Sequence, residues 1–325
     1  MHTDTIFDIG TKTAFEATAL KVFRMQYADN PVYREFCGYL NTKPAKVRQL
    51  TDIPFLPIGF FKSKEIISKG KKSEAIFTSS GTTGSLTSKH LVSDLQVYEH
   101  SFRKAFDHFY GNIKDYCVLA LLPSYLERQG SSLIYMVDDL IKQSGHEKSG
   151  FYLDDLEGLT DQLAQLEAAG TKTLLIGVSF ALLDMAENYP VKLRNTIIME
   201  TGGMKGRRKE LIREELHHIL KSGFGVEGIH SEYGMTELLS QAYSKGNGSF
   251  ETPPWMKILI RDTEDPMTYQ PMGKTGGMNI IDLANVNSCA FIATQDLGKM
   301  HPDGCFEILG RFDNSDIRGC NLMVL

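Results

Sequence analysis

The sequence predicts an α/β fold with a mostly parallel sheet flanked by helices, followed by a smaller mixed or antiparallel β subdomain. Between residues 74 and 254, short apolar runs typical of buried strands alternate with longer runs that have helical spacing. Such alternation is typical of parallel sheets that helices cover on both faces. After residue 255 the helix-like runs stop, and short strand-like runs follow one another between Gly-rich turns. This change of pattern predicts the second, smaller sheet.

The first 73 residues are predicted to form a helical N-terminal region. Apolar residues recur at helical spacing between Thr11 and Ala28. Asn30 followed by Pro31 has the form of an N-cap and a proline at the first position of the next helix. These signals predict consecutive helices before the α/β region begins.

The region from residue 74 to residue 254 is predicted to be the α/β core. Its expected strands cover residues 73–77, 117–122, 173–178, 196–200 and 227–233. Its expected helices cover residues 94–110, 131–143, 156–169, 180–188 and 209–220. No internal repeat is present, which favours one domain over an array of repeated units.

The β subdomain is predicted to span residues 255–309. Its strand-like runs cover residues 256–262, 277–283, 290–296 and 305–310. Residues 310–325 are left as a C-terminal tail. We therefore expect a single domain over 1–325 with four regions, namely 1–73, 74–254, 255–309 and 310–325.

Composition limits the classes of function. The 325 residues carry a net charge of −5 and no clustered basic face, so we expect no nucleic-acid partner. The five cysteines are odd in number and contain no CxxC pair, which favours a reducing compartment. No apolar run approaches the roughly 20 residues that a membrane span needs, and no signal-peptide pattern begins the chain. We expect a cytoplasmic protein without a membrane span.

Residues 77–90, FTSSGTTGSLTSKH, are rich in hydroxyl groups and glycine. A Gly/Ser/Thr loop after a strand can surround phosphate oxygens with backbone N–H groups and hydroxyl donors. Lys89 could add a positive charge to the same site. The stretch is not a Walker A loop, because the order GxxxxGK[ST] is absent. Composition alone leaves two interpretations open, a phosphate-binding loop and a flexible surface loop.

A second feature is the segment HSEYGMTE at residues 230–237. A predicted strand leads into a turn that carries Tyr233, Thr236 and Glu237. The glutamate suits a hard cation such as Mg²⁺ that is held partly through phosphate oxygens. The same residues also suit an ordinary helix N-terminus, with Thr236 as the cap and Glu237 in the first turn.

Taken together, SSGTTG (79–84) and YGMTE (233–237) resemble motifs of the adenylate-forming superfamily of acyl-CoA synthetases, luciferases and peptide-synthetase adenylation domains. Three further segments occur in the superfamily's order. They are TGG at 201–203, TQDLG at 294–298, and GR at 310–311 with RG at 318–319. The resemblance implies the large N-terminal-type core of this superfamily, with ATP and Mg²⁺ as cofactors and a hinge-like tail over 310–325.

The resemblance also implies roles for single residues. The triphosphate would lie against Thr78, Ser79, Ser80, Gly81, Thr82, Thr83 and Gly84. Lys89 would be a catalytic residue near these phosphates, Thr236 would contact the α-phosphate, and Glu237 would bind Mg²⁺. The nucleotide site would further include Tyr233, Gly234, Met235, Gly202, Gly203, Asp296 and Arg311. Among these, the two glycines would border the adenine, and Asp296 would accept hydrogen bonds from the ribose hydroxyls.

A narrower resemblance covers nearly the whole chain. The segments PFLPIGFFKSKEI (54–66), LLPSYLERQGSS (121–132), METGGMKGRRKEL (199–211) and GRFDNSDIRGCNLMV (310–324) are similar to the LuxE-type acyl-protein synthetases. This resemblance implies a ligase that activates a fatty acid with ATP and passes the acyl group to its own cysteine near the C-terminus. That cysteine would be Cys320, and an acyl-accepting reductase would be the next partner.

Two features depart from the superfamily pattern. Gly84 is followed by SLTS before Lys89, whereas the usual loop has its lysine three residues after the last glycine. The sequence also ends six residues after Gly319, so the usual C-terminal lid domain, with its second lysine, is expected to be absent. Other functions therefore stay open, namely a ligase that acylates CoA or a carrier protein, as phenylacetate-CoA ligases do with CoA, and a nucleotide-binding subunit without catalysis.

Two more residues need an interpretation. Ser179 follows a predicted strand and begins a helix, as a nucleophile elbow does, which would suit a serine hydrolase or acyltransferase. No histidine is obviously placed to serve as its base, and a pocket or cap role is the alternative. His230 precedes the Tyr233 turn and could face the nucleotide, or could be a packed histidine at the end of a strand.

Overall fold

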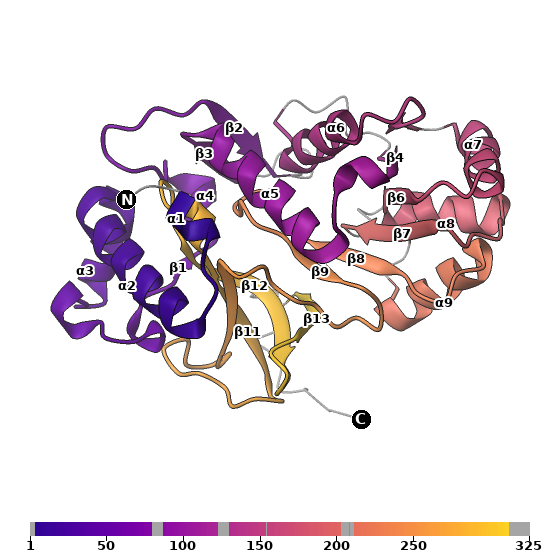
Figure 1. The fold of residues 1–325 in the computed structure, drawn as a ribbon. Coiled ribbons are helices and arrows are strands. Elements are labelled where there is room, and N and C mark those ends of the chain that lie inside the picture. Colours follow the sequence, from indigo (N-terminus) through magenta and orange to yellow (C-terminus); the bar gives the residue numbers. More distant parts are fainter. Residues whose placement is uncertain are drawn as a thin grey trace.

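In the computed structural model of the protein, residues 4–79, 87–122, 130–153, 155–202, 208 and 211–311 are described. The molecule contains three parts, namely the N-terminal helices, a mostly parallel sheet with its helices, and a mixed sheet (Figure 1). N-terminal helices cover one side of a mixed sheet, and a second, mostly parallel sheet is flanked by helices. The N-terminal helices and the mixed sheet occupy one half of the molecule, and the parallel sheet occupies the other.

The N-terminal region is helical, as its sequence pattern predicts. It consists of α1 (Asp4–Phe7), α2 (Lys12–Asp29), α3 (Pro31–Tyr39), η1 (Pro44–Lys46), η2 (Leu50–Asp52), β1 (Leu56–Pro57) and α4 (Phe60–Ser63). Asn30 ends α2 and begins α3, where its side-chain oxygen accepts a hydrogen bond of 3.1 Å from the Tyr33 N–H. Pro31 fills the first position of α3, where a missing N–H costs nothing.

The parallel sheet has six strands in the order β5-β4-β6-β7-β8-β9. Their bounds are Cys117–Leu121 for β4, Gly150–Phe151 for β5, Thr173–Val178 for β6, Thr196–Thr201 for β7, His230–Tyr233 for β8 and Ala242–Ser244 for β9. Only β9 runs antiparallel to its neighbour. Strands β4 and β6 are buried along their whole length, which explains their continuous apolar sequences.

Helices cover both faces of this sheet. They are α5 (Leu95–Tyr110), η3 (Ile113–Asp115), α6 (Ser132–Ser144), α7 (Leu156–Ala168), α8 (Ser179–Asn188) and α9 (Arg213–Phe224). Across the sheet, the connection from β4 to β5 moves toward one edge, and the connections from β5 through β6 and β7 to β8 move toward the other edge. Right-handed crossovers therefore place α6 on one face and α7, α8 and α9 on the opposite face. Helix α5 joins α6, because Nε of Arg103 donates a 2.8 Å hydrogen bond to Oδ2 of Asp139.

The second sheet is formed mainly by the C-terminal part of the described chain. Its order is β1-β12-β11-β10, and β13 pairs with β12. The bounds are Met256–Arg261 for β10, Thr275–Asp282 for β11, Phe291–Met300 for β12 and Phe306–Arg311 for β13, with η4 at Leu283–Asn285. All pairings are antiparallel except the short contact of β1 with β12. Buried Gln26 of α2 ties the N-terminal helices to this sheet through the carbonyl of Asn285 at 2.8 Å.

The α/β fold class is confirmed, with one difference in strand placement. The apolar run at 73–77 does not join the parallel sheet. It becomes β2 (Ala75–Thr78), which pairs with β3 (Lys89–Val92) in a separate two-stranded hairpin. The antiparallel partner β3 follows β2 after a single loop, so β2 pairs with a strand that is close in sequence.

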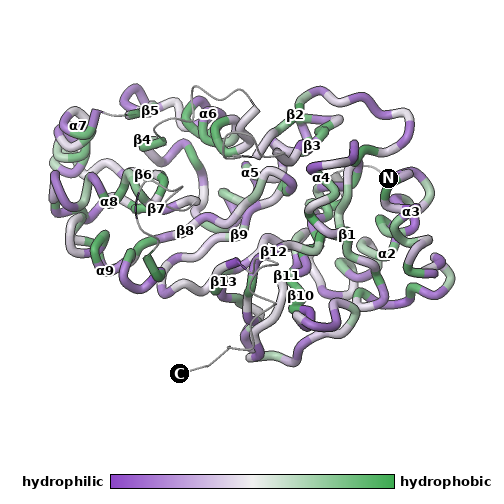
Figure 2. Tube along the Cα trace, turned by 180° about the vertical axis from the view of Figure 1, so that it is seen from behind, coloured by the Kyte–Doolittle hydropathy of each residue, from purple (hydrophilic) through white to green (hydrophobic). Residues whose placement is uncertain are grey.

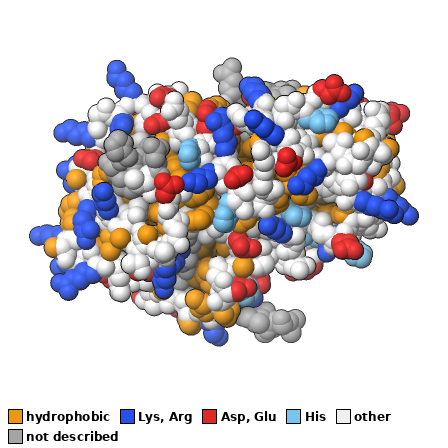
Figure 3. All heavy atoms as spheres, in the orientation of Figure 1, with side chains coloured by type: hydrophobic (Ala, Val, Ile, Leu, Met, Phe, Trp, Pro, Cys, Tyr) orange, Lys and Arg blue, Asp and Glu red, His pale blue; other side chains and the backbone are white. Residues whose placement is uncertain are grey.

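Apolar side chains are concentrated where the elements meet. In Figure 2 the strands of the parallel sheet carry many hydrophobic residues, whereas the loop that leads into β2 is largely hydrophilic. On the face shown in Figure 3, basic and acidic side chains are interspersed rather than gathered by sign. Among the described helices, none is both long enough and apolar enough to cross a membrane.

Candidate active site

The Gly/Ser/Thr stretch connects β2 to β3, and the residues at its two ends are hydrogen-bonded to each other. Thr78 and Lys89 are paired across the two strands. Beyond them, the Ser79 N–H donates to the Ser88 carbonyl at 3.1 Å, and the Ser88 N–H donates to Oγ of Ser79 at 2.9 Å. The Lys89 side chain is exposed. Five predicted phosphate ligands, Ser80, Gly81, Thr82, Thr83 and Gly84, lie outside the described residues.

The turn that carries Tyr233, Gly234, Met235, Thr236 and Glu237 follows directly after β8. The buried carboxylate of Asp282 holds the chain just beyond it. This carboxylate accepts hydrogen bonds from the Leu239 N–H at 2.8 Å, the Ser240 N–H at 3.0 Å and the Ser240 hydroxyl at 2.6 Å. The turn is therefore fixed from behind by the last residue of β11.

The base of the loop and the turn after β8 lie against each other. The ring atom Nδ1 of His90 is 2.8 Å from the carbonyl oxygen of Thr236. The Ser88 hydroxyl hydrogen-bonds the Glu237 carboxyl group and lowers its pKa, against the stronger effect of burial. The Glu237 carbonyl in turn accepts a 2.8 Å hydrogen bond from Nδ2 of Asn285. Two motifs more than 140 residues apart in sequence thus meet at one place.

Glu237, the predicted Mg²⁺ ligand, is a buried carboxyl group with several polar neighbours. It is 5% exposed, and burial raises its pKa. Ser88, Arg311 and Lys62 act in the opposite sense and favour the charged form. No group of three or more His, Cys, Asp or Glu residues in the described part of the chain could hold a metal by itself. One carboxylate beside the hydroxyl-rich loop fits the prediction of Mg²⁺, which is commonly bound through one or two carboxylates and substrate phosphates.

Three predicted nucleotide ligands meet beside this turn. The Tyr233 hydroxyl donates to Oδ2 of Asp296 at 2.7 Å, and Nε of Arg311 donates to Oδ1 at 2.9 Å. Asp296 is 6% exposed, whereas the Arg311 side chain is 65% exposed. A carboxylate has about four lone-pair positions, so Asp296 keeps acceptor capacity for a ribose diol in addition to these two donors.

The glycine turn after β7 is held by Ser179. Gly202 has φ of 72°, a conformation that favours glycine. Its carbonyl accepts a 2.7 Å hydrogen bond from Oγ of Ser179, which also lies 3.1 Å from Oε2 of Glu200. Gly203 lies outside the described residues.

This geometry opposes a nucleophilic role for Ser179. The side chain is 2% exposed, and its hydroxyl faces two acceptors. Within the described residues the nearby histidine, His217, contacts Glu200 at 3.7 Å rather than the serine. Ser179 is the first residue of α8 and positions the Gly202 turn.

His230 lies at the other end of β8 from Tyr233. Its Nδ1 is 3.3 Å from the Tyr110 hydroxyl, and burial lowers the pKa of the ring to about 4. It is a packed histidine at the start of a strand.

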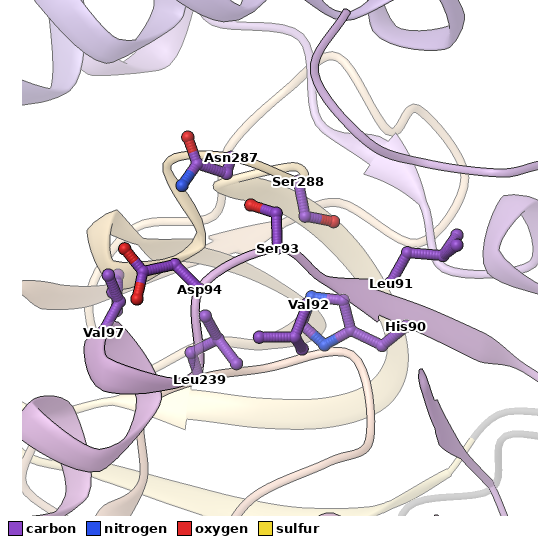
Figure 4. Close-up of a pocket in the computed structure, with 10 residues that line it drawn as sticks. His90, Leu91, Val92, Ser93, Asp94, Val97, Leu239, Asn287 and Ser288 are labelled. Carbon is purple, nitrogen blue, oxygen red and sulfur yellow. The ribbon is translucent and has the colours of Figure 1, made fainter. Parts of the chain in front are cut away.

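His90 is the histidine of the site that sequence reasoning missed. It is fully buried, and burial lowers its pKa to about 4, so the ring is neutral. The Nδ1 atom must then carry the proton that it donates to the Thr236 carbonyl. Within the described residues no well-aligned hydrogen bond reaches Nε2 or Oγ of Ser93, although the side chain of Asn285 lies near the ring and raises its pKa against the stronger effect of burial. His90 and Ser93 line a small pocket with room for about one water molecule (Figure 4).

Other residues of the site were also missed. Asp282 and Asn285 come from segments with no recognisable motif, so no local pattern could have found them. Lys62 lies in the LuxE-like segment 54–66, but the resemblance assigned it no role. Ser88 and His90 belong to the hydroxyl-rich stretch itself. The sequence does hold one signal for these two residues. In an extended chain after the loop, Ser88 and His90 are two positions apart and therefore point to the same face.

Comparisons with known proteins bear on the family and the fold of the chain. Residues 10–104 match the family model described as acyl-protein synthetase, LuxE. A comparison with curated protein sequences finds no match. Among solved structures, 2-hydroxyisobutyryl-CoA ligase in complex with R3-HIB-AMP is similar, with a TM-score of 0.66 and 11% identity over 93% of this chain and 68% of that one.

Two further structures share the fold. MatB from Rhodopseudomonas palustris with bound ATP has a TM-score of 0.57 and 19% identity over 75% of this chain. A luciferase-like enzyme from the nonluminescent Zophobas morio mealworm has a TM-score of 0.55 and 16% identity over 76% of this chain and 60% of that one. The chain spans about half the length of MatB, namely 49%. The expected resemblance is therefore confirmed: residues 10–104 match the LuxE acyl-protein synthetases, and the fold is that of the adenylate-forming enzymes.

Proposed function

We propose that this protein is an adenylate-forming ligase that activates a carboxylic acid with ATP. The observation that carries the proposal is the contact between the base of the hydroxyl-rich loop and the turn after β8, through His90 with Thr236 and Ser88 with Glu237. The contact brings the proposed phosphate donors and the proposed metal ligand Glu237 together, next to Asp296, the proposed ribose ligand.

The proposed reaction is an in-line displacement at the α-phosphorus of ATP. A carboxylate oxygen of the acid forms a bond to the α-phosphorus. The bond from that phosphorus to the bridging oxygen breaks, and pyrophosphate leaves with the electron pair. Charge grows on the bridging oxygen and on pyrophosphate, so positioning and charge stabilisation are the tasks of the protein.

The residues of this chain would divide those tasks. Thr78, Ser79 and the loop after them would bind the β- and γ-phosphates, Thr236 would bind the α-phosphate, and Asp296 with Arg311 would hold the ribose. Glu237 would hold Mg²⁺, which neutralises phosphate charge when bound. Lys62 of α4 already lies close enough to act on the pKa of Glu237, so a lysine of the N-terminal region reaches the same site. Lys89 would add charge at the loop.

The finer proposal concerns the acid and the acceptor. We propose a fatty acid as substrate and Cys320 as the first acceptor, as in the LuxE-type synthetases. The thiolate sulfur would attack the acyl carbon, the bond to the phosphate oxygen would break, and AMP would leave. A reductase or a carrier protein would then take the acyl group.

The four cysteines in the described part of the chain are poorly suited to accept an acyl group. Burial raises the pKa of all four, namely Cys37, Cys117, Cys289 and Cys305. A thiol with a raised pKa is a poor nucleophile at neutral pH. Cys320 lies outside the described residues, and Arg318 two positions earlier would favour its thiolate.

Acid-dependent exchange of labelled pyrophosphate into ATP tests the first half-reaction. A screen across fatty, aryl and amino acids should find exchange in the presence of Mg²⁺. Glu237→Ala should lower that exchange by about 10²–10³, comparable to the loss of one preorganised group. Glu251→Ala, which removes an exposed glutamate, is the matched control. Absence of exchange with every acid would contradict the proposal.

The second half-reaction needs a different readout. After incubation with ATP and the active acid, Cys320→Ser should keep pyrophosphate exchange but lose the hydroxylamine-sensitive acyl adduct seen by mass spectrometry of the intact protein. An adduct that persists places the acceptor at another residue. AMP release that requires CoA, without a protein adduct, would identify a CoA ligase instead.

A further inference from the structure

Glu232 is an acidic side chain at the candidate active site that the proposed reaction does not use. It is the third residue of β8, directly before Tyr233, and its cross-strand neighbour is Thr201 at the end of β7. Both lie at the carboxyl ends of parallel strands, where ligands of open α/β sheets bind. The Thr201 hydroxyl donates a 2.5 Å hydrogen bond to Oε2 of Glu232.

The side chain points to the face of the sheet that lacks the ribose-binding group. Successive residues of a strand face opposite sides, so Glu232 shares a face with His230 and not with Tyr233. His230 contacts Tyr110 at the end of α5, whereas Tyr233 contacts Asp296. Glu232 also raises the pKa values of Tyr98, Tyr110 and Tyr243, which places it among the side chains under α5.

No cation neutralises this carboxyl group within the described residues. The groups that act on it are Thr201 and a second acid, Glu200. Its other oxygen, Oε1, accepts no hydrogen bond there and lies against the turn, where a Cβ on Gly234 would come within 2.5 Å of it. The residue as a whole keeps partial solvent exposure. A partly shielded carboxyl group with unused acceptor capacity can accept a hydrogen bond from a bound ligand.

We infer that Glu232 binds a hydrogen-bond donor carried by the acid substrate, so that the protein prefers a hydroxy or amino acid to the plain acid of the same chain length. The inference rests on the proposed adenylation, because it assigns the acid to the α5 side of the strand ends. The acyl group would extend from the α-phosphate at Thr236 past Gly234 toward the free Oε1 atom. The nucleotide would stay on the Tyr233 and Asp296 side.

Pyrophosphate exchange with matched acids tests this inference. Short, medium and long straight-chain acids would each be compared with their 2-hydroxy, 3-hydroxy and 3-amino counterparts. The enzyme should show a kcat/KM for one donor-bearing acid that is about 10- to 100-fold above that of its plain partner. The hydroxy and amino arms distinguish which donor is recognised.

Two variants assign the preference to this residue. Glu232→Leu should remove the preference by lowering exchange with the donor-bearing acid while plain-acid exchange persists, a change that unfolding cannot produce. Glu227→Leu, at an exposed position before the same strand, should keep the preference.

The outcomes separate this inference from the proposed function. If the wild-type protein uses plain acids best and Glu232→Leu leaves the ratio unchanged, the inference is wrong and adenylation stands. If Glu232→Leu raises the KM for ATP equally with every acid, the side chain faces the nucleotide and the inference is also wrong. If no acid supports exchange, the proposed function itself fails.

Discussion

The imidazole of His90 lies 2.8 Å, at Nδ1, from the carbonyl oxygen of Thr236. This single contact joins the strand after the hydroxyl-rich loop to the turn that carries Glu237. The ring also meets Phe61 edge-on at 5.7 Å, so α4 and its Lys62 are held against the same point. The three parts of the proposed phosphate site therefore depend on one buried side chain.

Replacing His90 should loosen this junction. We expect His90→Leu to lower acid-dependent exchange by about 10- to 100-fold, because a misplaced reacting group costs rate even when the chemistry is intact. The half-saturating Mg²⁺ concentration should rise, since the main chain of Glu237 follows Thr236. His108→Leu removes an exposed histidine of α5 and is the control. An unchanged Mg²⁺ dependence would show that His90 does not position the turn.

The ribose assignment of Asp296 predicts a specific pattern of nucleotide affinity. The protein should bind ATP about 10-fold or more tightly than 2′,3′-dideoxy-ATP, because a hydrogen bond to a charged group contributes about 1.5–3 kcal/mol. Asp296→Ala should bind the two nucleotides alike. Tyr233→Phe should retain the difference, since it removes only one of the donors on this carboxylate. Calorimetric titration measures all three, and discrimination that survives Asp296→Ala would refute the assignment.

The titration of Glu232 predicts how stability changes with pH. Burial raises its pKa to about 7, and Glu200 adds to this effect while Thr201 opposes it. The folded protein therefore binds this proton more tightly than the unfolded chain does, and its stability falls as the pH rises from the ordinary glutamate range toward the raised pKa. The tyrosines around it titrate only at higher pH. Glu232→Gln cannot ionise and should escape the loss.

Urea unfolding at pH 5 and at pH 8 measures this effect. Between those values the stability of Glu232→Gln relative to the wild-type protein should increase by roughly 1–3 kcal/mol. Parallel pH profiles for the two proteins would contradict the raised pKa.

We expect the Asp282 side chain to contribute mainly to the stability of the fold rather than directly to catalysis. It is fully buried, and its loss would strand the N–H groups of Leu239 and Ser240 without an acceptor. We expect Asp282→Ala to lower the free energy of unfolding by about 2–4 kcal/mol. Asp265→Ala, at an exposed loop position, should cost far less. A small effect at Asp282 would mean that the turn is held by other contacts.

The fold was largely predictable because its signals are local. Short, mostly apolar runs such as 173–178, with β-branched residues, are typical of buried strands, and Asn30-Pro31 marks a helix start wherever the helix finally packs. Which strands pair with each other was harder to predict from the sequence. The run at 73–77 was predicted to be a strand like those of the parallel sheet, but it pairs with β3 in the β2–β3 hairpin.

For residues that stand in motifs, the structure shows which of them lie together. Thr236, Glu237 and Asp296 were named from resemblance, and the structure brings Glu237 to Ser88 and Asp296 to Tyr233. His90 and Asp282 were not named, because their role lies in contacts across 146 and 42 positions of sequence. Such contacts depend on tertiary packing, which no local pattern records.

A crystal structure with Mg²⁺ and a non-hydrolysable ATP analogue tests the central claim most directly. We expect the α-phosphate within hydrogen-bonding distance of Thr236, the metal ion on the Glu237 carboxylate, and the ribose hydroxyls on Asp296. A triphosphate bound away from both the β2–β3 loop and the turn after β8, with Glu237 free of metal, would contradict it.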